Sequence, residues 1–112
     1  MPVKFEEYNG VCVISIKGDL AGDDVLSTTK TAADMIDHRQ IVDFVVDLER
    51  TPFIDSAGLE ALLAVKQKCE DVFGQLKLAG ADENVKRILE VTRLSHRFQC
   101  VDDVPTALKT MR

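Results

Sequence analysis

The sequence lacks a membrane-spanning run, a basic cluster and paired cysteines. A transmembrane helix needs about 20 consecutive apolar residues, and a secretory leader needs a basic segment before an apolar one; neither pattern occurs. We therefore expect a cytoplasmic protein that does not contact a membrane. Lys and Arg number 14 against 19 Asp and Glu, which gives a formal net charge of −5. Because phosphate binding needs concentrated Lys and Arg, this balance argues against nucleic acid as a direct partner.

Cysteine is scarce, and its spacing excludes a disulfide framework. Cys12, Cys69 and Cys100 are odd in number and lie far apart, each within an apolar stretch. Disulfide scaffolds and zinc sites need paired or clustered cysteines. The spacing predicts three reduced thiols packed in the interior, and it points to no metal site and no cofactor.

The remaining composition is that of an ordinary folded protein. The chain has 112 residues, of which 46% are hydrophobic and 29% are charged. Natural domains most often have about 100–150 residues, so this length suits one domain over residues 1–112. A chain of this size can bury enough surface to form a core without disulfides or metals.

Two short β-type runs, Val3–Tyr8 and Val11–Lys17, open the chain on either side of Asn9-Gly10. Asn-Gly tolerates the positive φ angles of a type I′ turn, so we expect an antiparallel hairpin that places Tyr8 opposite Val11. The period of 2 along each strand then brings five apolar residues to the face toward the core. These are Val3, Phe5, Cys12, Ile14 and Ile16.

Helical and strand patterns alternate through the rest of the chain. Asp23 or Asp24 provides a cap for the first helix, and Asp102 or Asp103 provides one for the last. The run IVDFVVDL suits a central strand that is covered on both faces. The expected elements are a helix from 23 or 24 to about 38, a strand over 41–48, a helix from about 56 to about 74, a strand over 76–79, a helix containing 85–89, a strand over 98–101 and a short terminal helix.

The resulting order, ββαβαβαβα, predicts an α/β fold. Strands joined through helices must be largely parallel and connected by right-handed crossovers, whereas the opening hairpin is antiparallel. We therefore expect a mixed, mostly parallel sheet with an N-terminal hairpin and about four helices.

The segment Asp55-Ser56-Ala57-Gly58-Leu59 lies where a strand and loop lead into the first turn of a helix. Loops that follow strands often carry function in α/β folds. Unpaired N–H groups and the helix dipole favour an anion at this point, so the fold would tolerate a phosphate on Ser56. The residues alone favour a simpler interpretation, in which Asp55 or Ser56 is a helix N-cap.

The sequence contains serine, histidine and aspartate, the residue types of a hydrolase triad, but it does not place them in the spacing of one. A nucleophile elbow has glycine two residues before and after the serine, and here Ile54 precedes Ser56 at that distance. The spacing specifies neither His38 nor His96 as a base, and we expect both to be exposed. The pairs Asp23-Asp24 and Asp102-Asp103 look like first-turn helix residues, because adjacent helical positions do not face each other. The sequence therefore predicts no enzyme.

The string VVDLERTPFIDSAGLEALL over Val45–Leu63 resembles the signature of the STAS domain, and specifically of the stand-alone bacterial anti-sigma factor antagonists. That signature has a hydrophobic strand, a short loop, Asp-Ser-(Ser or Ala)-Gly-Leu and an apolar helix. The element order, the length and Leu78-Ala79-Gly80 before a helix also resemble the family.

The resemblance implies partner switching. In the family, the unmodified antagonist binds an anti-sigma factor that is also a serine kinase, and the sigma factor is released. The kinase phosphorylates the antagonist, and a metal-dependent serine phosphatase reverses the reaction. By motif position Ser56 is the phosphoacceptor, and Asp55, Ala57, Gly58, Asp19 and Asp23 belong to the surface that binds the partner. The protein itself is expected to be a monomer or a weak dimer.

Two positions depart from the family pattern. The family often has Gly-Glu-Leu-Asp after the second strand, where this chain has Gly18-Asp19-Leu20-Ala21, so Ala21 cannot supply the carboxylate. Asp19, Asp23 or Asp24 could replace it, or these residues could belong to a solvated loop with helix caps. Glu60 stands where a small residue is common.

Two further alternatives stay open. Gly58 could let a partner's backbone approach closely, or it could relieve crowding in the first helical turn. The domain could also be a non-phosphorylated scaffold subunit, for instance in lipid transport or in a switch rewired to a target other than transcription.

Overall fold

Within residues 3–111, which the structure describes apart from the side chains of Asp23 and Asp24, strands and helices alternate in the predicted order. This structure is a computed structural model. The elements are β1 (Val3–Tyr8), β2 (Val11–Lys17), α1 (Asp23–Arg39), β3 (Asp43–Arg50), α2 (Ser56–Asp71), β4 (Gln75–Ala79), α3 (Glu83–Val91), β5 (Gln99–Val101) and α4 (Val104–Lys109). The α/β class and the ββαβαβαβα order are confirmed.

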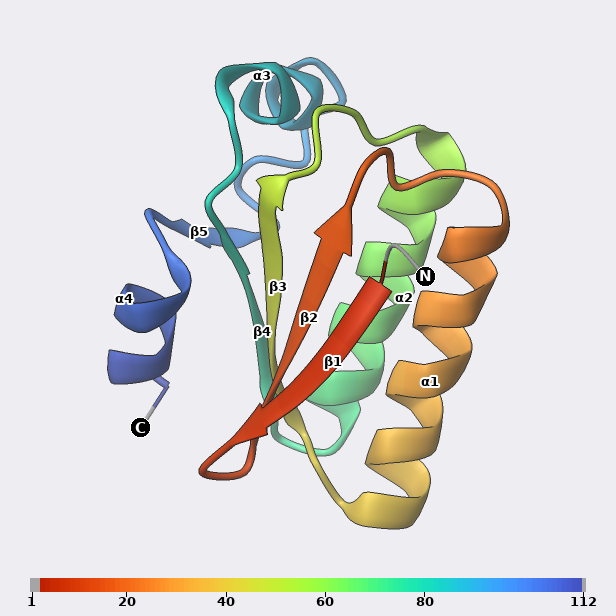
Figure 1. Ribbon diagram of the computed structural model, residues 1–112, viewed down its shortest axis with the longest axis vertical. Coiled ribbons are helices and arrows are strands. Elements are labelled where there is room, and N and C mark those ends of the chain that lie inside the picture. The colour runs from red at the N-terminus through yellow and green to blue at the C-terminus, as the bar shows by residue number, and fades with distance from the viewer. Residues whose placement is uncertain (1–2, 112) are drawn as a thin grey trace.

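The strands form one sheet of five in the order β1-β2-β3-β4-β5. β1 is antiparallel to β2, and the other neighbours are parallel. β3 is the central strand, as its apolar sequence predicts (Figure 1). The register of β2 against β3 shifts between Ser15 and Lys17, so β3 has one extra residue near its end.

The opening hairpin has the predicted turn and register. Asn9 and Gly10 have φ angles of 51° and 84°, which is the left-handed conformation that a type I′ turn requires. Tyr8 lies opposite Val11, and Val3 lies opposite Ile16. The apolar face of the hairpin therefore points toward the core as expected.

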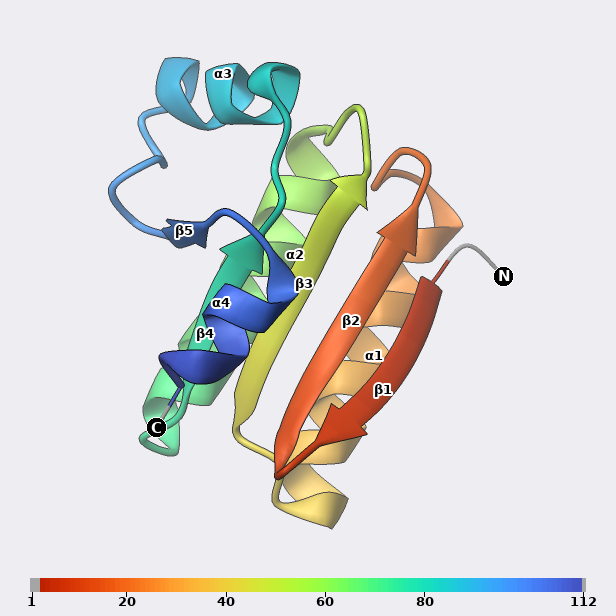
Figure 2. The same ribbon diagram turned by 60° about the vertical axis from the view of Figure 1, so that its left-hand side comes forward.

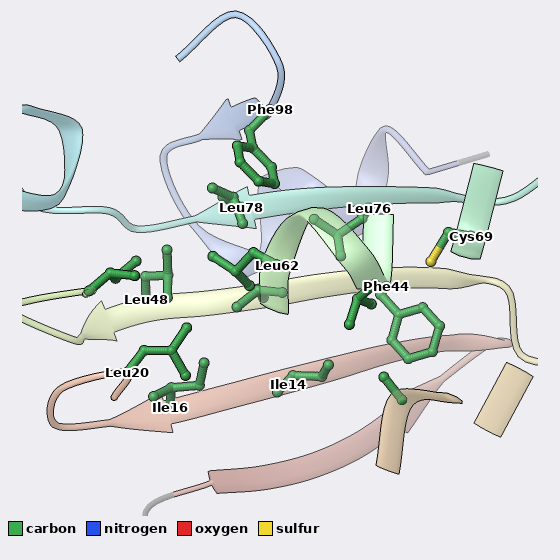
Figure 3. Close-up of a cluster of buried hydrophobic side chains, with 14 of the residues drawn as sticks. Ile14, Ile16, Leu20, Phe44, Leu48, Leu62, Cys69, Leu76, Leu78 and Phe98 are labelled. Carbon is green, nitrogen blue, oxygen red and sulfur yellow. The ribbon is translucent and has the colours of Figure 1, made fainter. Parts of the chain in front are cut away.

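Helices cover the two faces of the sheet unequally. α1 and α2 pack side by side against one face, whereas the short helix α4 lies over β3 and β4 on the other (Figure 2). The larger core lies under α1 and α2, where side chains of β2, β3 and β4 meet those of α2 (Figure 3). Across the described part of the chain, no helix is both long and apolar enough to cross a bilayer.

Two of the three cysteines are packed as predicted. Burial raises the pKa of Cys12 to about 11 and that of Cys69 to about 12, so both thiols stay protonated at neutral pH. Cys100 is exposed on β5, and the prediction that it is packed was wrong. β5 has only three residues at the edge of the sheet, and Cys100 pairs with Leu78 only through the backbone ladder.

The start of α1 also differs from the prediction. Its N-cap is Gly22, with φ of 63° and no capping hydrogen bond from a side chain, so neither Asp23 nor Asp24 is the cap. Both residues lie inside the first turn of the helix. At α4 the choice between two aspartates is resolved, because Asp103 accepts a hydrogen bond from the Thr106 N–H.

Lys77 is a buried charge that the strand pattern does not reveal. It lies on β4 with 2% of its surface exposed, and its ammonium group donates to the Thr110 hydroxyl at 2.6 Å and to the Thr110 carbonyl at 3.2 Å. Thr110 is the C-cap of α4, where the helix dipole favours a cation. Lys77 therefore holds the end of α4 against the sheet.

We expect Lys77→Met to lower the free energy of unfolding by about 1 kcal/mol, because it keeps the apolar stem and removes the hydrogen bonds to Thr110. Urea denaturation measures the change. Lys109→Met, at an exposed position of α4, is the matched control and should be neutral within about 0.5 kcal/mol. If Lys77→Met is as stable as the unchanged chain, the ammonium group does not contribute to holding α4.

Candidate functional site

Two loops run side by side at the carboxyl end of the parallel strands. The loop after β2 covers residues 18–22, and the loop after β3 covers residues 51–55. Leu20 donates its N–H to the Phe53 carbonyl at 3.0 Å, and Asp55 donates its N–H to the Leu20 carbonyl at 3.4 Å. Leu20 and Ile54 form a parallel bridge, and both side chains are buried. The loops thus continue the pairing of β2 and β3 beyond the strands.

Polar side chains anchor the second loop at its beginning. Thr51 is buried, and its hydroxyl donates to the Ile16 carbonyl at 2.8 Å. Asn84, on α3, donates its side-chain N–H to the Pro52 carbonyl at 2.7 Å. No local sequence pattern predicts either anchor, because each joins residues that lie more than 30 positions apart.

Asp55 is the N-cap of α2. Its backbone is extended, with φ of −90°, and its carboxylate accepts the Gly58 N–H at 2.7 Å. This contact satisfies one of the amide groups that a helix leaves unpaired in its first turn. Of the two capping residues that the sequence allowed, the structure selects Asp55.

Ser56 is therefore the first residue of the helix proper and is not needed as its cap. The residue is exposed. Within the part of the chain that the structure describes, the Ser56 hydroxyl forms no hydrogen bond with the protein, and α2 begins without its help. Ala57 beside it is also exposed. The helix thus presents an unused hydroxyl to solvent at its amino end.

Gly58 is buried against the neighbouring loop. A Cβ atom at this position would lie 2.5 Å from the Leu20 carbonyl oxygen and 2.8 Å from Cγ2 of Ile54. The close approach of α2 to the first loop therefore requires glycine here. This contact supports the interpretation that Gly58 relieves crowding, and the approach of a partner's backbone stays a prediction.

The charges around Ser56 are acidic. Asp55 precedes it, and Glu60 is exposed four residues later, which places its carboxylate on the same face of the helix. No acidic residue lies in the first turn of α2 itself. An added phosphate would therefore be stabilised by the helix dipole and repelled by the two carboxylates.

The first loop carries Asp19, one of the predicted partner-binding residues, beside the segment that contains Ser56. Asp19 is exposed and precedes Leu20, whose backbone pairs with Phe53 and Asp55. Ala21 is half-buried. Asp23 begins α1, but its side chain lies outside the described residues. The structure thus joins the Asp19 loop to the Ser56 loop through backbone contacts.

Among the described residues, no hydrogen bond joins Ser56 to either histidine. His38 and His96 are both exposed, as predicted. His38 lies in the last turn of α1, at the opposite end of that helix from the loop that pairs with the Ser56 segment.

These features define an α/β protein with a mostly parallel sheet, at whose carboxyl edge a capped helix exposes a serine in its first turn. The model of the STAS domain matches residues 2–107, and the chain belongs to this family. The family resemblance in the sequence is thereby confirmed.

Solved structures with the same fold include anti-sigma factor antagonists. SpoIIAA of Bacillus in its phosphorylated form has 20% identity and a TM-score of 0.81, with 98% of this chain and 99% of that chain covered. SpoIIAA in its unphosphorylated form has 18% identity and a TM-score of 0.78, with 96% and 94% covered. An anti-sigma factor antagonist from Mycobacterium paratuberculosis has 22% identity and a TM-score of 0.84, with 98% and 92% covered.

Proposed function

We propose that this chain is an anti-sigma factor antagonist of a partner-switching pathway. Its unphosphorylated form binds an anti-sigma factor that is also a serine kinase, which releases the sigma factor, and phosphorylation of Ser56 ends the binding. The observation that carries the proposal is the division of roles at the start of α2, where Asp55 caps the helix and leaves the exposed Ser56 hydroxyl unused.

A kinase needs an accessible hydroxyl whose modification does not unfold its substrate. Ser56 meets this requirement, because no hydrogen bond to the described residues must break before its oxygen can attack a phosphoryl group. The unpaired amides and the dipole at the start of α2 favour the negative product. That a protein of this fold, SpoIIAA of Bacillus, has been solved in a phosphorylated form supports the same modification here.

The added charge explains how phosphorylation would end binding. A phosphate brings about −1.5 to −2 charges at pH 7 and lies beside Asp55 and Glu60 on a chain that already carries −5. In a protein contact, such a group is costly to desolvate and repels acidic groups of the partner. The bound state is therefore lost while the fold persists.

The proposed contact surface surrounds the serine on two loops. Asp55 and Ala57 belong to the start of α2, and Asp19 and Asp23 belong to the segment after β2. Gly58 is buried beneath this surface and lets α2 approach the first loop closely. Asp19 replaces the carboxylate that Ala21 cannot supply, since it is exposed on the loop that pairs with the Ser56 segment. A metal-dependent serine phosphatase restores the binding form. The switch acts in the cytoplasm through one domain over residues 1–112.

The proposal is tested by incubating the protein with magnesium, ATP and the anti-sigma-type serine kinases of the same genome, followed by mass spectrometry of the peptides. We expect one phosphate, on Ser56. The matched control is Ser56→Ala, which should take up no phosphate and should keep the circular dichroism spectrum of the unchanged chain. Phosphate on a different residue, or none with any of the kinases, overturns the proposal; the second result favours a scaffold role.

A further inference from the structure

The open edge of the sheet at β1 carries a self-complementary pattern. β1 pairs with β2 alone and is the outermost strand in both views (Figures 1 and 2). A sheet edge offers unpaired N–H and C=O groups to another strand. Natural proteins protect such edges with charged side chains, especially lysine, or with proline. The described strand has no proline, and its charges, on Lys4, Glu6 and Glu7, are of both signs, so they can attract a second copy of the strand as well as repel it.

The hairpin turn determines which backbone groups are available. In a hairpin closed by a two-residue loop, the residues flanking the loop exchange both hydrogen bonds, and every second residue then does the same. Tyr8, Glu6 and Lys4 therefore direct their backbone groups toward β2. Val3, Phe5 and Glu7 direct theirs to the open edge, with no backbone partner among residues 3–111.

We propose that two copies of this chain associate through antiparallel pairing of their β1 strands, with Phe5 opposite Phe5 at the twofold axis. This register pairs Val3 with Glu7 of the second copy, so all the outward backbone groups meet. Their sheets then form one continuous sheet. The proposal is independent of phosphorylation at Ser56.

The charges of Lys4 and Glu6 favour this register over the two registers centred on the adjacent residues. Centring the pair on Phe5 places Lys4 opposite Glu6 of the second copy, and the reverse pair forms by symmetry. Shifting the centre to Lys4 or to Glu6 places two like charges directly opposite each other, which is destabilising. Both side chains are available, since they are 72% and 40% exposed, and their charged atoms lie 3.9 Å apart within one copy. The dimer would join these pairs into a cluster of four alternating charges.

The aromatic residue at the centre adds a contact on the opposite face. Phe5 is half-buried and packs against the core beneath the helices. A second Phe5 directly across the strand boundary forms a cross-strand aromatic pair, which is among the favourable pairs in antiparallel sheets.

Sedimentation equilibrium tests the proposal over roughly 1 μM to 1 mM protein, the range of weak association. We expect reversible dimers of the unchanged chain. Lys4→Glu and Glu6→Lys each place like charges across the interface, so each should raise the dissociation constant about tenfold or more. The double variant Lys4→Glu/Glu6→Lys restores opposite charges and should recover the dimer.

Lys30→Glu is the matched control, because it makes the same charge change at an exposed position of α1 and should leave the dimer intact. Circular dichroism checks that each variant is folded. A chain that is monomeric throughout the range overturns the proposal. Dimers that are unaffected by the single charge reversals, or that the double variant does not recover, overturn the assigned interface and register.

Discussion

Ser56→Asp is expected to weaken binding to the anti-sigma kinase at least about 100-fold, which corresponds to about 2.7 kcal/mol. The carboxylate places a fixed negative charge on the exposed position where the proposed contact forms. Removing that charge from water and opposing it to acidic groups costs several kcal/mol in an interface. Isothermal titration calorimetry with the kinase, under conditions without phosphoryl transfer, measures the loss.

The same variant is expected to keep its stability. Asp55 and not Ser56 accepts the Gly58 N–H, so the cap of α2 survives the substitution. A carboxylate in the first turn gains about 0.3–1 kcal/mol from the helix dipole, and repulsion from Asp55 and Glu60 offsets that gain. We therefore expect a melting temperature within about 2 °C of the unchanged chain.

Thr106→Asp provides a control matched in the added charge, in the first turn of another capped helix. Thr106 is exposed in the first turn of α4, which is also capped by an aspartate, but α4 lies on the other face of the sheet. This variant should bind the kinase as the unchanged chain does. Equal weakening by both variants would show a general effect of net charge, and a Ser56→Asp chain that unfolds would show that the serine is structural.

Local patterns predicted most of the fold because the energetics of these elements are local. The turn at Asn9-Gly10 determines the hairpin register through its own φ angles, and the predicted pairing of Tyr8 with Val11 is confirmed. The run at 41–48 predicted a central strand, since a short run with so few polar residues suits a strand that is covered on both faces. The first helix was less well predicted at its start, because Gly22 caps α1 without a side chain.

The sequence places Asp55 and Ser56 at the start of a helix, but it does not predict how the candidate site around them is arranged. Asp55 and Ser56 both have side chains that cap helices, and the sequence alone does not distinguish them. The choice depends on backbone geometry that the paired loops impose through Leu20 and Phe53. The hydrogen bonds by which Thr51 and Asn84 anchor the second loop likewise join distant segments, so no local sequence pattern predicts them.

The same distant contacts make Gly58 a sensitive position. We expect Gly58→Ala to lower the free energy of unfolding by about 2 kcal/mol, because overpacking costs about 1–3 kcal/mol or more. The new methyl group would lie 2.5 Å from a backbone oxygen of Leu20, which no change of rotamer can relieve. Alanine has a better helix propensity than glycine, but this offsets at most about 1 kcal/mol of the lost stability.

Measuring stability and kinase binding together distinguishes the two roles considered for this glycine. Crowding inside the fold predicts a melting temperature lowered by about 8 °C, as for any loss of about 2 kcal/mol in a domain of this size. A partner's backbone that approaches Gly58 predicts instead an unchanged melting temperature and weakened binding. Ala57→Gly is the matched control for the stability measurement alone, since it changes an exposed neighbour in the same turn and should alter stability by at most about 1 kcal/mol. Because Gly58 is buried against Leu20 and Ile54, we expect the first result.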